Sequence, residues 1–182
     1  MIYQLFLEQL NMKYLFLSKL LLFILTSCQA QAPLHQNTIQ NISKNGMSIS
    51  WHHQNDRIYI EMSAPTDGWV AIGFNTHAGT TGTYLLMGHI INGKANVVEY
   101  YTTSPGDYNP ITTHGAQAKI QDIEGVEKGK SSTLKFSLPI LATSKYQRNL
   151  TEGTAYIMLI AYSREDDFKH HSMMRTSVEV KL

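Results

Sequence analysis

The stretch DGWVAIGF at residues 67–74 is the clearest indication of fold class in this chain. An Asp-Gly turn leads into an apolar run that is too short and too rich in glycine for a stable helix. A continuous apolar run of this kind is typical of a central β-strand that is buried on both faces. The run TAYIMLIAY at residues 154–162 has the same character. We therefore expect a sheet with two strands that are buried on both sides.

Alternation of apolar and polar residues with a period of two extends on both sides of this stretch. It is clear in RIYIEMSA at 57–64, TLKFSLP at 133–139 and TSVEVKL at 176–182. Such strands have one buried and one solvated face, as in antiparallel sheets. Turn residues recur between them, and Asn92-Gly93 is a strong signal for a tight hairpin. The sequence therefore predicts an all-β fold, an antiparallel β-sandwich of about nine or more strands.

The first 28 residues are typical of an export signal. From Met12 the chain reads MKYLFLSKLLLFILTSC, in which Lys13 and Lys19 flank the start of an apolar run. The run is shorter than the ~20 residues that a membrane-spanning helix needs, and it fits the apolar part of a secretory signal. The residues 25–28 resemble a bacterial lipobox, which predicts that Cys28 carries a lipid. We expect Met12 to be the true start; a plain secretory signal and an N-terminal membrane helix remain alternatives.

This interpretation divides the chain into three parts. Residues 1–28 form the signal or lipoprotein segment, residues 29–45 are a polar, aperiodic tether, and residues 46–182 are the folded domain. Several acyl chains on Cys28 would anchor the protein stably to a membrane. We therefore expect a protein of the cell envelope, anchored on the periplasmic or outer surface, or secreted if Cys28 is not lipidated.

Composition and motifs make some functions improbable. The formal net charge is +1 and no basic run is present, so we expect no nucleic-acid partner. The chain has no nucleophile elbow, no phosphate-binding glycine loop and no HExxH motif. We therefore expect a binding module and not an enzyme.

Three features in order resemble the DOMON domain family. DGWVAIGF is followed by the glycine-rich loop NTHAGTTGT at 75–83, then by the strand pair YLLMGHIINGKANVVEYY at 84–101, and the chain ends with AYSREDDFKHH and an arginine. The resemblance covers roughly residues 46–182. It implies an immunoglobulin-like β-sandwich outside the cytoplasm that binds heme or sugar. Where such domains bind b-type heme, a methionine and a histidine hold the iron and the role is electron transfer with a redox partner protein.

The resemblance also implies candidate ligands for the iron. His170 and His171 lie where the family's histidine is expected, and both remain candidates. The loop at 75–83, where the methionine is expected, contains His77 instead, and Met87 lies in the following strand. Three interpretations stay open: Met87 is the second ligand, His77 replaces it, or no heme binds. In the last case Met87 would fill the core.

The C-terminal loop supports further expectations. Arg175 is expected to pair with Asp166 or Asp167 and so to fix the loop, although it could instead bind a heme propionate. His52 and His53 could join the later histidines in a metal site, but their spacing matches no zinc signature. The alternative function is a cofactor-free carbohydrate-binding or protein-interaction module. For a sugar, the aromatic residues Tyr100, Tyr101 and Tyr108 could form a platform, which cross-strand packing would explain equally well.

Overall fold

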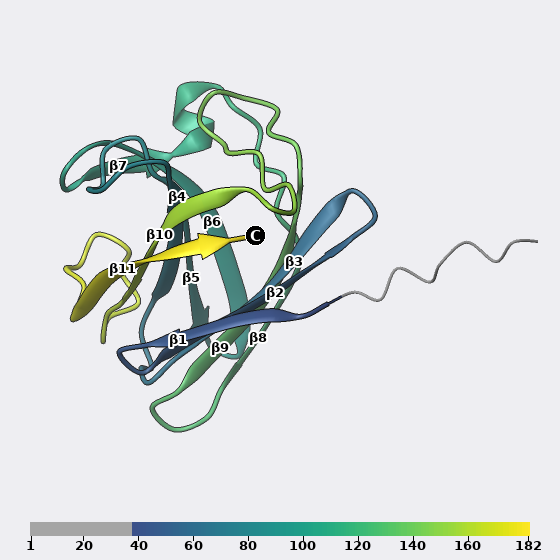
Figure 1. Ribbon diagram of the computed structural model, residues 1–182. Coiled ribbons are helices and arrows are strands. Elements are labelled where there is room, and N and C mark those ends of the chain that lie inside the picture. The colour runs from purple at the N-terminus through teal and green to yellow at the C-terminus, as the bar shows by residue number, and fades with distance from the viewer. Residues whose placement is uncertain (1–37) are drawn as a thin grey trace, which may run out of the picture. The chain divides into compact units, whose positions relative to one another are not determined.

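The computed structural model describes residues 38–182, in which two antiparallel sheets face each other (Figure 1). The predicted signal segment, Cys28 and the start of the predicted tether lie outside the described residues. Within residues 38–182, no helix has the length and apolar character needed to cross a membrane.

The sandwich is built from eleven strands and one short 3-10 helix. The five-stranded sheet has the order β1 (Gln40–Lys44), β2 (Met47–Gln54), β3 (Arg57–Ala64), β9 (Ser132–Pro139) and β8 (Gln121–Glu127). The six-stranded sheet has the order β11 (Met174–Lys181), β10 (Ala155–Tyr162), β4 (Val70–Asn75), β5 (Tyr84–Ile91), β6 (Lys94–Ser104) and β7 (Asp107–Pro110). The helix η1 (Ile111–His114) follows β7. The predicted antiparallel sandwich is confirmed.

The predicted boundary at residue 46 needs correction. Strand β1 pairs with β2 from Gln40↔Trp51 to Lys44↔Met47, so the sheet begins inside the stretch that the sequence assigns to a tether. The physical reason is that β1 is an edge strand. None of its side chains is fully buried, and only Ile42 packs against the core. An edge strand of this kind shows no apolar alternation by which it could be recognised.

The alternating residues fill the space between the sheets. Strand β3 alternates strictly, with Ile58, Ile60 and Met62 buried in the core. Strand β4 is buried along its whole length, as its apolar run predicts. Its inner face packs into the main core, and Ala71 on its outer face belongs to a second, smaller apolar cluster. This outer cluster on the six-stranded sheet forms the base of the site described below.

The hairpin between β5 and β6 has the predicted turn. Asn92 and Gly93 both have positive φ, 52° and 72°, as a type I′ hairpin requires. The turn fixes the register of the two strands, in which Met87 pairs with Val98 and Leu86 with Glu99. Side chains of β5 therefore alternate between the inner core and the outer cluster.

A buried carboxylate secures one end of the sandwich. Glu99 on β6 is 1% exposed and accepts hydrogen bonds from Tyr84 Oη at 2.7 Å and Gln147 Nε2 at 2.9 Å. It also accepts bonds from the backbone N–H groups of Lys119 and Ile120. Four donors satisfy the buried charge, which would otherwise be costly. They tie β5, the segment before β8 and the loop after β9 to β6.

Candidate functional site

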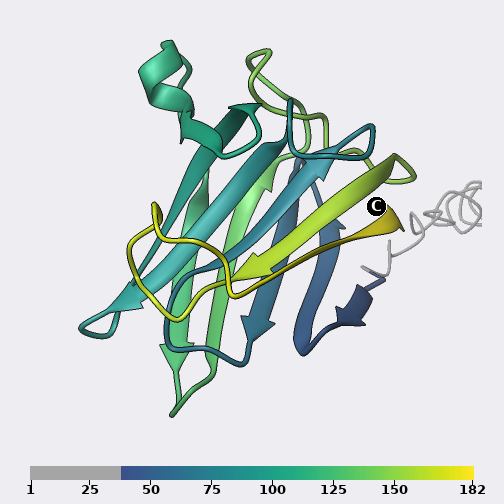
Figure 2. The same ribbon diagram turned by 90° about the vertical axis from the view of Figure 1, so that its left-hand side faces the viewer.

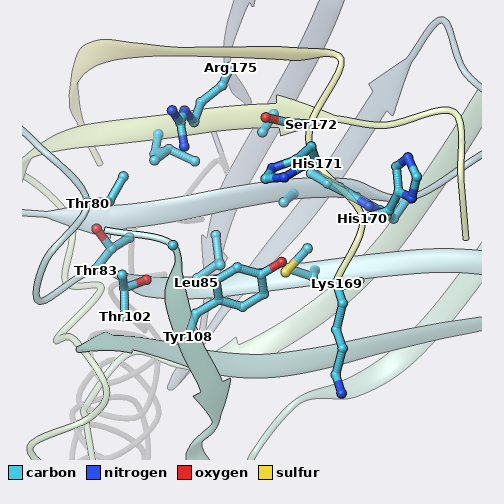
Figure 3. Close-up of a pocket in the computed structure, with 16 residues that line it drawn as sticks. Thr80, Thr83, Leu85, Thr102, Tyr108, Lys169, His170, His171, Ser172 and Arg175 are labelled. Carbon is cyan, nitrogen blue, oxygen red and sulfur yellow. The ribbon is translucent and has the colours of Figure 1, made fainter. Parts of the chain in front are cut away.

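A pocket of about 140 Å³ lies on the outer face of the six-stranded sheet (Figure 3). Its floor is apolar, and its walls carry the hydroxyl groups of Thr80, Thr83 and Thr102. The loop between β10 and β11 covers it; in Figure 2 this yellow loop crosses in front of the sheet. The floor residues are Trp69, Ala71, Leu85, Met87, Leu159 and Ala161. The pocket is thus on a face of the sandwich, whereas the sequence places the candidate ligands at its end.

The floor follows from the register of four strands. Met87 on β5 pairs with Ala71 on β4, Ala71 pairs with Ala161 on β10, and Ala161 pairs with Arg175 on β11. All four residues line the pocket. The two alanines leave the space into which larger side chains would project. The pocket therefore lies over Ala71 and Ala161, where the outer cluster has its smallest side chains.

The Asp-Gly-Trp turn holds the start of the covering loop. Trp69 donates its backbone N–H to Glu165 O at 3.0 Å, and Ser163 donates to Trp69 O at 3.0 Å. A Cβ on Gly68 would lie 2.5 Å from the backbone carbon of Arg164, so a side chain there would clash. This close approach explains why glycine precedes the tryptophan. The motif that indicates the fold also positions the loop over the pocket.

An aromatic clamp holds the middle of the covering loop. Phe168 stacks on His89, with ring centroids 4.4 Å apart, and meets Tyr100 edge-on at 5.9 Å. The hydroxyl of Tyr108 donates a hydrogen bond to Phe168 O. His89 Nδ1 lies 2.8 Å from Asp166 O and, since a carbonyl only accepts, donates to it. His89, which shares a face of β5 with Met87, thus secures the loop.

The predicted pairing of Arg175 with Asp166 or Asp167 is wrong. Arg175 forms no side-chain hydrogen bond and no ion pair within residues 38–182. Asp167 Oδ1 instead accepts the backbone N–H of Lys169 at 3.0 Å, and Asp166 Oδ1 is buried without a partner. The physical reason is the register of β11, which directs Arg175 to the pocket. Turn bonds and the aromatic clamp fix the loop.

Both predicted histidines line the pocket, and both are exposed. Their rings diverge, as expected for neighbours on an extended chain. In Figure 3 the ring of His171 lies on the side of Arg175, whereas the ring of His170 lies farther along the loop and Lys169 extends away from the pocket. The structure therefore brings together Met87, His170, His171 and Arg175.

The other candidates lie elsewhere. His77 does not line the pocket; its Nδ1 donates to Ala78 O at 2.9 Å in the loop between β4 and β5. His52 stacks on Tyr59, and His53 Nε2 bonds to Leu150 O at 2.7 Å. Residues 38–182 contain no cluster of three or more His, Cys, Asp or Glu side chains that could hold a metal ion.

The predicted tyrosine platform is divided between two faces. Tyr100 packs edge-on against Tyr108 at 5.6 Å beside the pocket, whereas Tyr101 contacts Tyr146 on the other face of β6. Burial raises the pKa of the Tyr108 hydroxyl, and the charge of Asp167 raises it further. The same causes raise the pKa of Tyr100, together with the charge of Tyr108. Tyr108 therefore stays protonated and keeps donating to the covering loop.

Sequence reasoning missed much of the floor and the clamp. Ala71 and Ala161 give no chemical signal, because their contribution is the space that they leave. Phe168 gives a weak one, as an aromatic residue in a polar loop. Trp69 was recognised only as part of the motif, yet its indole N–H is buried and has no partner in the described part of the chain.

The donor chemistry of the pocket suits a heme. The floor is apolar, one thioether lies in it, two imidazoles lie on the covering loop, and an unpaired guanidinium stands at the edge. A thioether and an imidazole are established iron ligands, and arginine pairs with carboxylates in a fork geometry. The volume of about 140 Å³ is below the roughly 300–1,000 Å³ of most ligand pockets. A ligand of heme size therefore requires the covering loop to move outward.

Comparison with known families and structures agrees with the fold. The DOMON domain model matches residues 43–163, which ends just before the loop with the two histidines. The chain is 20% identical over 138 residues to DBH-like monooxygenase protein 1 of Mus musculus, covering 74% of this chain and 22% of that protein. The chain thus spans about a fifth of the length of this relative.

Two solved structures share the architecture. One is the cytochrome b domain of pyranose dehydrogenase from Coprinopsis cinerea, with a TM-score of 0.57 and 8% identity over 78% of this chain and 80% of that one. The other is the cytochrome domain of cellobiose dehydrogenase from Myriococcum thermophilum, with a TM-score of 0.55 and 7% identity over 79% and 81%. At such identities the likeness concerns the fold alone.

Proposed function

The chain belongs to the DOMON domain family, and from this premise we propose that it is an extracytoplasmic binding module that holds a b-type heme for electron transfer. The pocket on the outer face of the six-stranded sheet is the proposed site. The observation that carries the proposal is that Met87 on β5 and the His170-His171 pair, distant in sequence, line one cavity. The cytochrome domains with the same fold support the choice of heme.

Each residue has a defined part in this proposal. Met87 offers the thioether from the floor, and His171 offers the imidazole from the covering loop, with His170 as the alternative. Arg175, free of protein partners among the described residues, would bind a carboxylate at the edge of the ligand. A bound heme would supply one-electron redox chemistry, with a potential raised by the methionine.

The size of the cavity makes the covering loop part of the binding event. The aromatic clamp and the hydrogen bonds of His89 and Tyr108 are non-covalent, so the loop can open and close again on a ligand. Closure would bring an imidazole from its exposed position toward the floor. We therefore expect binding to include a slow conformational step.

The test is reconstitution of the purified full-length chain with hemin. The proposal predicts a stoichiometric complex with a sharp Soret band and low-spin features in the reduced state. His171→Ala should abolish the low-spin features if His171 is the ligand, and His170→Ala if His170 is. A well-folded protein that takes up no hemin, or a complex whose spectrum neither variant changes, would contradict the proposal.

The cellular setting is part of the same proposal. A lipid on Cys28 would place the domain at the surface of a membrane, where it would exchange electrons with a redox partner protein. Labelling with a radioactive fatty acid, lost in Cys28→Ser, tests the anchor independently of the heme.

A carbohydrate is the second candidate ligand, and the pocket volume favours it. A space of about 140 Å³ accepts a small polar ring more readily than a macrocycle. The hydroxyls of Thr80 and Thr102 in the walls and the unpartnered N–H of Trp69 offer hydrogen bonds to sugar hydroxyls. Titration with a panel of monosaccharides distinguishes the two candidates. The carbohydrate is favoured if the wild-type chain binds a sugar but no hemin, and if Thr102→Val loses the sugar binding.

A further inference from the structure

A second group of polar side chains lies on the other face of β6 from the pocket. Thr102 lines the pocket, so its neighbour Tyr101 points to the opposite face of the strand. There Tyr101 meets Tyr146 edge-on at 5.2 Å and His114 at 6.4 Å. In Figure 2, the teal helix η1 and the light green loop after β9 both lie at the upper end of the sandwich. This end joins segments that are far apart in the sequence.

Three polar atoms converge on Gly82 in the loop between β4 and β5. The position that a Cβ would occupy on Gly82 is 3.7 Å from Arg148 Nη2, 3.8 Å from His77 Nε2 and 3.8 Å from Tyr101 Oη. Gly82 has a φ of 77°, a conformation that other residues seldom adopt, and it has no side chain to fill this space. The bare face of Gly82 is therefore surrounded by a guanidinium, an imidazole and a phenol.

Arg148 lacks a counter-ion in this cluster. It is partly buried, its Nη2 donates to Gly82 O and its Nη1 to Gln147 O at 3.3 Å. Its Nε is buried without a partner, and it forms no ion pair within residues 38–182. Burying the Nε donor of a charged guanidinium without an acceptor costs free energy, and an anion beside Arg148 would offset this cost.

The cluster is built on a fixed support. Gln147, next to Arg148, donates to the buried carboxylate of Glu99 at 2.9 Å. Its side-chain oxygen Oε1 accepts hydrogen bonds from the hydroxyls of Thr143 and Ser144, which order the loop after β9. Arg148 is therefore held in position before any ligand binds, as a preorganised site requires.

We propose that Arg148, Tyr101 and His77 bind a small oxyanion, a carboxylate or a phosphate, at Gly82. The planar guanidinium of Arg148 can bind either a carboxylate or a phosphate, and the hydroxyl of Tyr101 can donate a further hydrogen bond. Nδ1 of His77 donates to Ala78 O, so Nε2 donates to an anion only from the protonated ring. The site is separate from the heme pocket and does not depend on the proposed function.

Isothermal titration calorimetry of the full-length chain tests the proposal. The probes are inorganic phosphate and acetate, each at constant ionic strength in a chloride buffer. Tyr101→Phe keeps the ring and removes the hydroxyl, and Arg148→Gln keeps an amide that can donate to Gly82 O. Each should weaken binding roughly tenfold or more, because hydrogen bonds to a charged ligand are lost. Tyr59→Phe, on β3 of the other sheet, is the matched control and should bind as the wild type does.

The outcomes separate the ligands and can overturn the site. Tighter binding of phosphate identifies a phosphate site, and tighter binding of acetate a carboxylate site. The proposal fails if neither anion gives saturable binding up to about 10 mM, an affinity below which no specific site need be invoked. It also fails if Tyr101→Phe and Arg148→Gln both bind as the wild type does while their melting temperatures show intact folds. Neither result changes the expected uptake of hemin on the other face.

Discussion

Met87 and Arg175 lie at the two ends of one row of residues that crosses four strands of the six-stranded sheet. Ala71 and Ala161 lie between them. With strands about 4.8 Å apart, the row separates the thioether and the guanidinium by about 14 Å of sheet. The row between them is apolar, because only the methyl groups of Ala71 and Ala161 project from it. This arrangement suits an apolar ligand with a carboxylate at one edge.

Replacing Met87 by leucine tests the thioether without disturbing the fold. Leucine keeps the volume and apolar character of a residue that is 2% exposed, so the free energy of unfolding should change by less than about 1.5 kcal/mol. The low-spin spectrum of the hemin complex should be lost, since leucine offers no ligand atom. Met158→Leu makes the same change in the core between the sheets and should leave the spectrum intact. Equal spectra for both variants would exclude Met87 as a ligand.

Filling the floor of the pocket should block ligand binding. In Ala71→Leu, the new side chain projects into the cavity, so we expect hemin or sugar binding to fall below detection with little loss of stability. Ala64→Leu adds the same atoms to the close-packed core and should cost about 1–3 kcal/mol. Chemical denaturation and ligand titration of the two variants measure this contrast. Normal binding by Ala71→Leu would place the ligand elsewhere.

Removing the aromatic clamp should release the covering loop. Phe168→Ala loses the stacking on His89 and the contact with Tyr100, which together hold the middle of the loop. Amide hydrogen exchange in residues 164–172 should become faster, and ligand association should accelerate, because opening of the loop precedes binding. Met173→Ala, an exposed change in the same loop, should alter neither rate. Unchanged exchange in Phe168→Ala would show that the turn bonds alone hold the loop.

Sequence patterns predicted the layers of this protein because burial imposes them. Strands such as β3 alternate strictly, and β4 is apolar throughout because one face meets the core and the other meets the outer cluster. Strand β1 was not predicted, because an edge strand with exposed side chains has no such pattern. The chain belongs to the family that its motifs resemble, and the two histidines to which this resemblance points both line the pocket.

The assembly of the site could not be read from the sequence. It depends on register, which brings Arg175 into the row of Met87 and away from the aspartates of the loop. It also depends on the small side chains of Ala71 and Ala161 and on the lack of a side chain at Gly68, and a single sequence does not show that these positions must be small. The role of His89 as an anchor required the contact with Phe168 to be seen.

The buried carboxylate of Glu99 allows a test of how the end of the sandwich near Glu99 is stabilised. In Glu99→Gln, an amide group that donates would replace an oxygen that accepts, so at least one of the four donors loses its partner. We expect a loss of roughly 2–4 kcal/mol in the free energy of unfolding. Glu61→Gln breaks only the exposed ion pair with Lys135 and should cost less than about 1 kcal/mol. Equal losses in urea denaturation would contradict the structural role of Glu99.

The pKa of Tyr84 gives the protein a defined sensitivity to base. Burial, the charge of Glu99 and the hydrogen bond to Glu99 all raise this pKa well above its ordinary value. In the unfolded chain the phenol titrates near pH ~10. Below that pH both states keep the proton, so Tyr84 adds no dependence on pH. Above it the unfolded chain loses the proton and the native protein retains it, so the free energy of unfolding falls as the pH rises.

Tyr84→Phe should therefore separate two effects. At neutral pH the variant should lose about 1–3 kcal/mol, because Oε2 of Glu99 loses one of its two donors and keeps only Gln147 Nε2. Above pH ~10 its stability should decline less steeply than that of the wild type, since one group with a raised pKa is gone. Tyr156→Phe is the control: burial also raises the pKa of Tyr156, but Arg148 opposes the shift, so the slope should change less. Urea denaturation between about pH 7 and 11 measures both effects, and an unchanged slope in Tyr84→Phe would show that the native phenol titrates like the unfolded one.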